Sequence, residues 1–258
     1  PLLAGLVTVS LLGTSCEHVP IPGVDNCRLT PTDSFWRANV SSLPKHPSSD
    51  AWIATAGGSS RSIKADFGSG LWEGGPIGIP YDVVPGNAPK RTITFDVPEE
   101  SDLVGYPVKN PPTVEGGTNN PLNDGARHVI MVDKDNCRLY ETGSTYPGPG
   151  GSWTSGITAF SGATWDMGSN QMRPDTWTPA DAAGLPILPG LVRYEEVEAG
   201  KVLHAIRMTV SQTRGTYVWP ASHEASSNMS SSVPPMGSWL RLKPTVDDAL
   251  VDAPSIAH

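Results

Sequence analysis

The chain carries little positive charge and has no long apolar run beyond its first fifteen residues. Its 18 Lys and Arg residues are outnumbered by 26 Asp and Glu, which gives a net charge of −8. Nucleic-acid binding requires a basic surface, so we expect no nucleic acid among the partners. A transmembrane helix needs about 20 consecutive apolar residues, and no later segment approaches that length.

Cysteine is scarce, and one of the three cysteines, Cys16, closes the apolar N-terminal run. Residues 2–12 have the length of a signal-peptide core, and the small residues Gly13-Thr14-Ser15 precede Cys16. We therefore interpret residues 1–15 as the remnant of an export signal. Cys16 is then a candidate lipidation site and the expected contact with a membrane. Ordinary cleavage after Ser15 is one alternative, and a buried N-terminal strand or helix is another.

The other two cysteines, Cys27 and Cys137, lie in identical pentapeptides, Asp-Asn-Cys-Arg-Leu. An exported protein meets an oxidising environment, in which these thiols can pair. The disulfide would close a loop of about 110 residues and contribute on the order of 4–5 kcal/mol of stability. A free buried thiol at either position is the alternative. We predict the disulfide.

Helix signals are few, whereas the 27 Gly and 26 Pro residues punctuate many short β-rich segments. This pattern predicts a mainly β protein, an antiparallel β-sandwich or jelly roll with one or two short helices and long Gly/Pro-rich loops. We expect a single domain over residues 16–258. The predicted helices span 178–184 and 194–200. The predicted strands span 77–84, 92–97, 127–132, 137–141, 202–210, 216–219 and 238–242.

Two strand pairs are predicted from the turns between them. Residues 127–132 and 137–141 flank a polar turn and predict a hairpin. Residues 77–84 and 92–97 flank Pro85-Gly86-Asn87 and predict a second pair. The Pro- and Gly-rich stretch 99–124 is consistent with an interdomain linker, but the predicted disulfide spans it, which favours a surface loop within one domain.

Several longer motifs occur together along the chain. They are Asp33-Ser34-Phe35-Trp36, Lys45-His46-Pro47, Gly78-Ile79-Pro80-Tyr81, Arg127-His128, Cys137-Arg138-Leu139-Tyr140-Glu141, residues 182–193 and Tyr217-Val218-Trp219-Pro220-Ala221. The set resembles a broad group of secreted, mostly bacterial uncharacterised proteins, over nearly all of the chain after Cys27. That group usually has Pro-Trp-Asn around Trp36. The resemblance implies no named reaction. It implies that the chain continues beyond Lys243, so we expect a fragment truncated at both ends.

Tryptophan is the most frequent aromatic residue, with eight Trp against six Tyr and four Phe. In exported β proteins, Trp side chains form flat platforms for sugar rings, and the indole N–H can bond a hydroxyl. Core packing is the competing explanation for any single Trp, because the side chain buries a large area. The candidate substrate-binding residues are Trp72, Tyr81, Trp165 and Trp219.

The candidate acid, base and charge-stabilising residues for glycan cleavage are His128, Glu141, Asp166, His204 and Arg207. A glycosidase requires two carboxylates flanking the bond that is cleaved, and a lyase requires a base with a cation that neutralises a uronate. Each histidine is alternatively a hydrogen-bonded core residue. The chain has no Glu-x-Asp-x-x-Glu strand and no metal-binding His spacing. We expect no metal and no cofactor.

These observations predict a secreted or cell-surface protein that engages polysaccharide or cell-wall glycan. Cys16 is the candidate site for a lipid anchor. The protein would bind the glycan or cleave it, as a glycoside hydrolase or polysaccharide lyase. The alternative is a non-catalytic adhesion module or structural lipoprotein. We expect a monomer.

Overall fold

The computed structural model describes residues 18–62, 68, 70–72, 74–118, 120, 126–177 and 180–243. The predicted export signal, Cys16 and the predicted C-terminal truncation all lie outside these residues. Strand residues outnumber helical ones, which confirms the mainly β class. Within the described ranges, no helix has the length and apolar character needed to cross a membrane.

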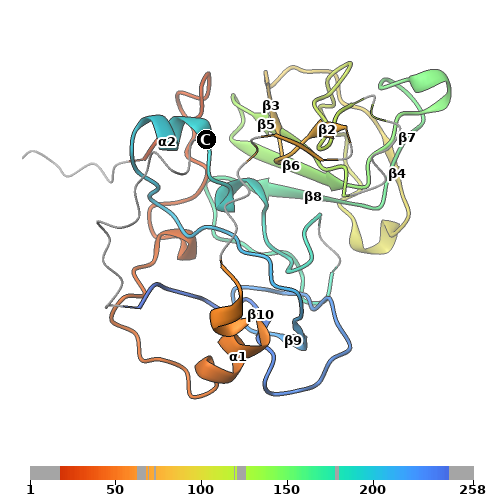
Figure 1. Ribbon diagram of the computed structural model, residues 1–258. Coiled ribbons are helices and arrows are strands. Elements are labelled where there is room, and N and C mark those ends of the chain that lie inside the picture. Colours follow the sequence, from red (N-terminus) through yellow and green to blue (C-terminus); the bar gives the residue numbers. More distant parts are fainter. Residues whose placement is uncertain are drawn as a thin grey trace, which may run out of the picture.

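A four-stranded mixed sheet forms the centre of the fold (Figure 1). Its strands are β3 (Tyr81–Val84), β5 (Val129–Asp133), β6 (Arg138–Gly143) and β8 (Ser161–Asp166), in the order β3-β5-β6-β8. β3 runs parallel to β5, whereas β5 with β6 and β6 with β8 are antiparallel. The antiparallel β5–β6 pair confirms the predicted hairpin.

The remaining strands form three two-stranded sheets. They are β1 (Leu71–Trp72) with β2 (Gly75–Pro76), β4 (Ile93–Phe95) with β7 (Ile157–Ala159), and β9 (Arg214–Tyr217) with β10 (Pro235–Met236). The predicted pairing of 77–84 with 92–97 is wrong. β3 pairs instead with β5, and β4 pairs in parallel with β7, because both strands find partners far along the chain rather than across the intervening turn.

Two short α-helices and several 3-10 turns complete the described elements. The α-helices are α1 (Ser49–Thr55) and α2 (Tyr194–Glu198), and α2 confirms the helix predicted at 194–200. The described part of the other predicted helix, residues 180–184, forms bends and turns. The 3-10 turns are η1 (Phe35–Arg37), η2 (Gly58–Ser60), η3 (Pro98–Glu100), η4 (Pro149–Gly151) and η5 (Leu188–Gly190).

Both faces of the central sheet are buried, which explains why β5 is apolar at nearly every position. Side chains alternate along a strand, so Ile130 and Val132 enter one core cluster and Val129 and Met131 enter the other. The first cluster also contains Trp165 and residues from the 21–27 and 187–188 segments. The second cluster lies between the sheet and the β4–β7 pair, and includes Trp153 and Tyr106.

Residues 202–210 form no strand, contrary to the prediction, and neither do residues 238–242. The first segment is irregular because its backbone forms hydrogen bonds with the 3-10 turns η1 and η5 instead of with a neighbouring strand. The N–H of Ala205 donates to the carbonyl of Trp36 at 2.6 Å, and the N–H of Arg207 donates to the carbonyl of Gly190 at 2.9 Å.

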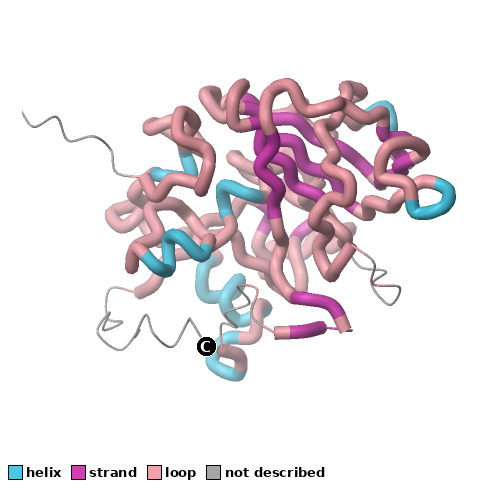
Figure 2. Tube along the Cα trace, turned by 90° about the horizontal axis from the view of Figure 1, so that it is seen from above, coloured by secondary structure: helices cyan, strands magenta, loops and turns pink. Residues whose placement is uncertain are grey.

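Loops make up most of the chain outside the sheets and surround the strands (Figure 2). In Figure 1, α1, β9 and β10 lie together, away from the four-stranded sheet. Trp52 of α1 donates its indole N–H to the carbonyl of Ser231 at 3.0 Å. Cys27 and Cys137 form the predicted disulfide, with their Cα atoms 5.4 Å apart.

A candidate ligand pocket

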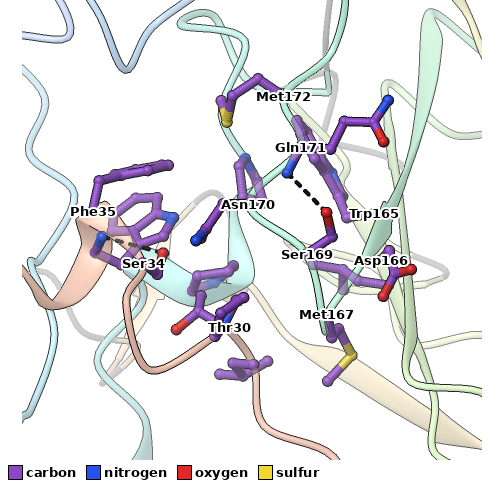
Figure 3. Close-up of a pocket in the computed structure, with 16 residues that line it drawn as sticks. Thr30, Ser34, Phe35, Trp165, Asp166, Met167, Ser169, Asn170, Gln171 and Met172 are labelled. Carbon is purple, nitrogen blue, oxygen red and sulfur yellow. Dashed lines mark hydrogen bonds between the residues drawn. The ribbon is translucent and has the colours of Figure 1, made fainter.

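A small pocket lies between the N-terminal segment 29–36 and the 166–172 loop that follows β8. Its volume is about 30 Å³, and Leu139, Pro186 and Pro189 complete its walls. In Figure 3, Phe35 of the first segment and Trp165 of β8 stand on opposite sides, with Asn170 between them. We call this cavity the indole pocket, because Trp36 and Trp165 both line it.

The two walls are tied to each other and to the sheet. The Cys27–Cys137 disulfide joins the N-terminal segment to the start of β6. The side-chain amide of Asn170 donates to the carboxylate of Asp33 at 2.9 Å, which links the loop to that segment. The N–H of Met167 donates to the carbonyl of Cys137 at 3.0 Å. The disulfide therefore lies beside both walls of the pocket.

Hydrogen bonds within the 166–172 loop set its conformation. The carboxylate of Asp166 accepts the N–H of Gly168 at 2.9 Å, and the carbonyl of Asp166 accepts the N–H of Ser169 at 3.0 Å. The hydroxyl of Ser169 accepts the N–H of Gln171 at 3.0 Å, as Figure 3 shows. Asp166 also faces Arg138 across 3.7 Å, and its half-exposed side chain lies at the rim.

Two buried donors at the pocket lack acceptors. Trp36 is 6% exposed and Trp165 is 7% exposed, and neither indole N–H finds an acceptor in the described part of the chain. The indole N–H can only donate, so an acceptor must come from elsewhere. Leaving a buried donor unpaired costs roughly 1–3 kcal/mol. A ligand that brings an acceptor into the pocket would recover part of this cost.

A row of aromatic rings connects the pocket to the surface. The ring centroids of Phe35 and Trp36 are 5.3 Å apart, and those of Phe35 and Trp219 are 5.5 Å apart in an edge-on contact. Trp219 is 68% exposed. We call Trp219, Phe35 and Trp36 the aromatic row. It provides an exposed flat ring next to a cavity that contains buried donors.

The predicted substrate-binding residues differ in how far their side chains are buried. Trp219 is exposed, as a platform for a sugar requires. Trp165 belongs to the first core cluster, which fits the competing explanation of core packing, although one part of it lines the pocket. Tyr81 is half-buried on β3 against the same cluster, where burial raises its pKa. Trp72 lies in β1, and its side chain is outside the described structure.

His128 is held on both sides by the protein itself. Its Nδ1 lies 2.6 Å from a carboxylate oxygen of Glu115, and its Nε2 lies 3.0 Å from the carbonyl oxygen of Ala180. Burial alone would raise the pKa of Glu115, but the hydrogen bond and the charge of His128 lower it. Both ring nitrogens are occupied, which fits the alternative of a hydrogen-bonded core histidine.

Glu141 is fully buried on β6 and anchors a wall of the pocket. Its carboxylate accepts the backbone N–H groups of Ile187 and Leu188 at 2.9 Å. Burial raises its pKa to about 7, against the lowering effect of these hydrogen bonds and of Arg207. The bonded residues lie between Pro186 and Pro189, which line the pocket. Glu141 thus positions the wall from behind.

His204 and Arg207 are each paired with an acidic residue. His204 lies 3.0 Å from Glu196, whose pKa is raised by burial but brought below its usual value by hydrogen bonds from His204 and Arg193. Arg207 lies 2.7 Å from Asp181. The predicted strand over 202–210, which would have carried both residues, is wrong, because the segment is irregular.

The five predicted catalytic residues therefore do not form one cleft. His128, Glu141 and Arg207 lie in one region, since the charge of Arg207 acts on both Glu115 and Glu141. None of the three lines the indole pocket, and only Asp166 of the five does. The bonds of His128 to Ala180 and of Glu141 to Ile187 and Leu188 attach the segment 180–188 to the sheet. Arg207 holds Asp181 of the same segment from outside the sheet, so all three are positioning residues for the pocket wall.

Sequence reasoning did not identify Phe35 and Trp36 as site residues. The signal was present in the adjacent aromatic pair close to Cys27, but the cavity forms only when two distant loops meet. Among the described residues, no group of three or more His, Cys, Asp or Glu side chains could hold a metal ion. Comparisons of the chain with protein-family models, with curated proteins and with solved structures give no match.

Proposed function

We propose that the protein binds polysaccharide through the aromatic row and the indole pocket. The observation that carries this proposal is the row itself, in which exposed Trp219 leads through Phe35 to the buried indole donor of Trp36, while the second donor without an acceptor, that of Trp165, lies across the pocket. Aromatic side chains offer a sugar both a large apolar face and a polar tip. Sugar oxygens supply the acceptors that the indole groups lack.

Binding without cleavage fits the site better than hydrolysis. A glycosidase needs two carboxyl groups about 5–9.5 Å apart across the scissile bond. Asp166 is the only acidic residue among those lining the pocket. The acid–base pairs His128 with Glu115 and His204 with Glu196 do not line the pocket and are engaged in internal contacts. We therefore favour a secreted or surface-exposed binding module.

The supporting scaffold is, in this proposal, sandwich-like. The second core cluster lies between the four-stranded sheet and the β4–β7 pair, as the core of a sandwich lies between two sheets. The first cluster, on the opposite face, is covered by loops that include both walls of the indole pocket. The sheet thus provides a rigid base for a loop-built site.

A glycan array followed by calorimetry on the best ligand tests the proposal. We expect replacement of Trp219 by Ala to weaken binding about tenfold, because the ring that stacks on the sugar is removed. Tyr194→Ala is the matched control, since Tyr194 is 74% exposed and does not line the pocket. Unchanged affinity in the Trp219 variant, or no binding to any glycan, would contradict the proposal.

Reducing-sugar release, measured on every polysaccharide that binds, separates binding from cleavage. We expect no product above the level of a buffer control, because a second carboxylate is absent from the pocket lining. Product formation that is lost in Asp166→Asn would show that the protein is a hydrolase.

A further inference from the structure

The size of the indole pocket limits what can enter it. Its volume of about 30 Å³ exceeds the ~10–15 Å³ needed to hold a water molecule but is far below the ~300–1,000 Å³ of pockets that enclose a drug-sized ligand. A sugar ring therefore remains outside, against Trp219 and Phe35. Only a small substituent of that sugar can occupy the cavity.

The lining of the pocket selects the chemistry of that substituent. Hydrocarbon and thioether groups form much of it: Leu29, Leu139, Met167, Met172, Pro186 and Pro189. Among the described residues that line the pocket, two buried side-chain polar atoms lack partners, the indole nitrogens of Trp36 and Trp165, and both are donors. The entering group should therefore have an apolar end and an acceptor. A hydroxyl would bring a donor of its own into largely apolar walls.

We propose that the indole pocket receives the acetyl group of an acetylated glycan, an inference that rests on the proposed function. The acetyl carbonyl accepts an indole N–H, and the methyl group packs against the methionine and leucine side chains. Amino sugars carry this group as an amide and other sugars carry it as an ester. The rim offers Asp166, Asn170 and Gln171 for the remaining polar atoms of the sugar.

Calorimetry with two neutral hexasaccharides tests the inference on the unmodified protein. The β-1,4 hexamer of N-acetylglucosamine and cellohexaose share a backbone and differ in the acetamido group at C2. We expect the acetylated hexamer to bind at least about tenfold more tightly, from one hydrogen bond and one buried methyl group. An N-propionyl hexamer should lose most of this advantage, because the added carbon exceeds the available space.

A second pair of ligands identifies the source of the acetyl group. An O-acetylated xylo-oligosaccharide is compared with its saponified form. A preference for the acetylated form in this pair alone assigns the pocket to esters, and a preference in the hexamer pair alone assigns it to amides. Either result supports the inference.

Variants connect the preference to the pocket. We expect Trp165→Phe to abolish the preference for the acetylated ligand, because an aromatic ring is kept while the indole N–H donor is lost. Trp153→Phe is the matched control, since Trp153 is buried in the second core cluster on the other face of the sheet. If Trp165→Phe fails to fold, the ligand comparisons on the unmodified protein still decide the question.

Equal affinity for the members of both ligand pairs would overturn the acetyl inference and leave the proposed function intact. Absence of binding to every glycan would overturn the proposed function and the inference with it. An acetyl preference that persists in Trp165→Phe and in Trp36→Phe would show that the acetyl group is recognised at another site.

Discussion

At the scale of single residues, the most unusual group is Glu141. It is fully buried, yet it lies on the sheet face that supports a surface pocket. Its hydrogen bonds to Ile187 and Leu188 account for its position, since they pair the backbone N–H groups of these two residues in the wall above it. Burial disfavours the charged form of the carboxyl group, so the pKa of Glu141 rises to about 7.

This shifted pKa predicts a pH-dependent stability. In the unfolded chain the carboxyl titrates near 4.5, whereas in the folded protein it titrates at about 7. Between these values the folded state retains a proton that the unfolded state has lost, so a rise in pH favours unfolding. We expect Glu141→Gln to flatten this dependence, by about 1.4 kcal/mol per pH unit across the window.

Urea unfolding of both proteins at pH 5, 6, 7 and 8 provides the measurement. The difference in unfolding free energy should move in favour of the Gln variant up to about pH 7 and then level off. A difference that stays constant over this range would show that the carboxyl of Glu141 has an ordinary pKa.

At the scale of elements, β8 illustrates how close packing depends on one small residue. Gly162 lies beneath the edge-on pair of Phe95 and Tyr106, and a Cβ at this position would lie 2.5 Å from the ring of Phe95 and 2.5 Å from the hydroxyl of Tyr106. Tyr106 is fully buried and donates its hydroxyl to the carbonyl of Asp102 at 2.9 Å. The two aromatic side chains therefore have no free space into which they could move if residue 162 carried a Cβ.

We expect Gly162→Ala to lower the free energy of unfolding by about 1–3 kcal/mol, because overpacking forces the two rings apart. Denaturant unfolding measures the loss. Thr94→Ala, on the exposed side of β4, is the control and should stay within about 0.5 kcal/mol of the parent protein. A Gly162 variant as stable as this control would mean that the sheet shifts freely at this point.

The elements that sequence analysis predicted correctly are those determined by local pattern. The β5–β6 hairpin follows from two β-rich runs around a polar turn, and α2 follows from acidic residues at a helix start. The parallel β3–β5 and β4–β7 pairings join distant segments, which a turn signal cannot reveal. Residues 202–210 have the sequence pattern of a strand, but backbone N–H groups of this segment donate to carbonyls of the 3-10 turns η1 and η5.

The same distinction applies to the candidate site. Exposed Trp219 follows from composition and context, whereas Trp36 enters the site because a loop 130 positions later folds against it. The predicted carboxylates and histidines are real polar groups, but their partners lie in other segments and could not be assigned from spacing. Glu115 and Glu196 pair with His128 and His204, the two histidines that the sequence offered as acid or base.

At the scale of the whole molecule, the Cys27–Cys137 disulfide connects the N-terminal segment to the central sheet. We expect the double variant Cys27→Ala with Cys137→Ala to lose roughly 4–5 kcal/mol of stability, since the bond closes a loop of 110 residues. Glycan binding should weaken more than tenfold, because segment 29–36 loses its covalent attachment beside the pocket.

Urea unfolding and calorimetry on the same samples check both effects, and circular dichroism confirms that the variant remains folded during the binding measurement. A folded variant that binds as tightly as the parent protein would show that Asn170 and the aromatic row hold the wall without the disulfide.

The position of this bond also sets an order of events in the life of the chain. In a molecule whose two thiols are still reduced, no covalent bond would hold the N-terminal wall of the pocket beside the sheet. If the protein binds polysaccharide as we propose, such a molecule would bind it more weakly before oxidation than after it. Formation of the disulfide would then determine when the protein reaches its full affinity for carbohydrate.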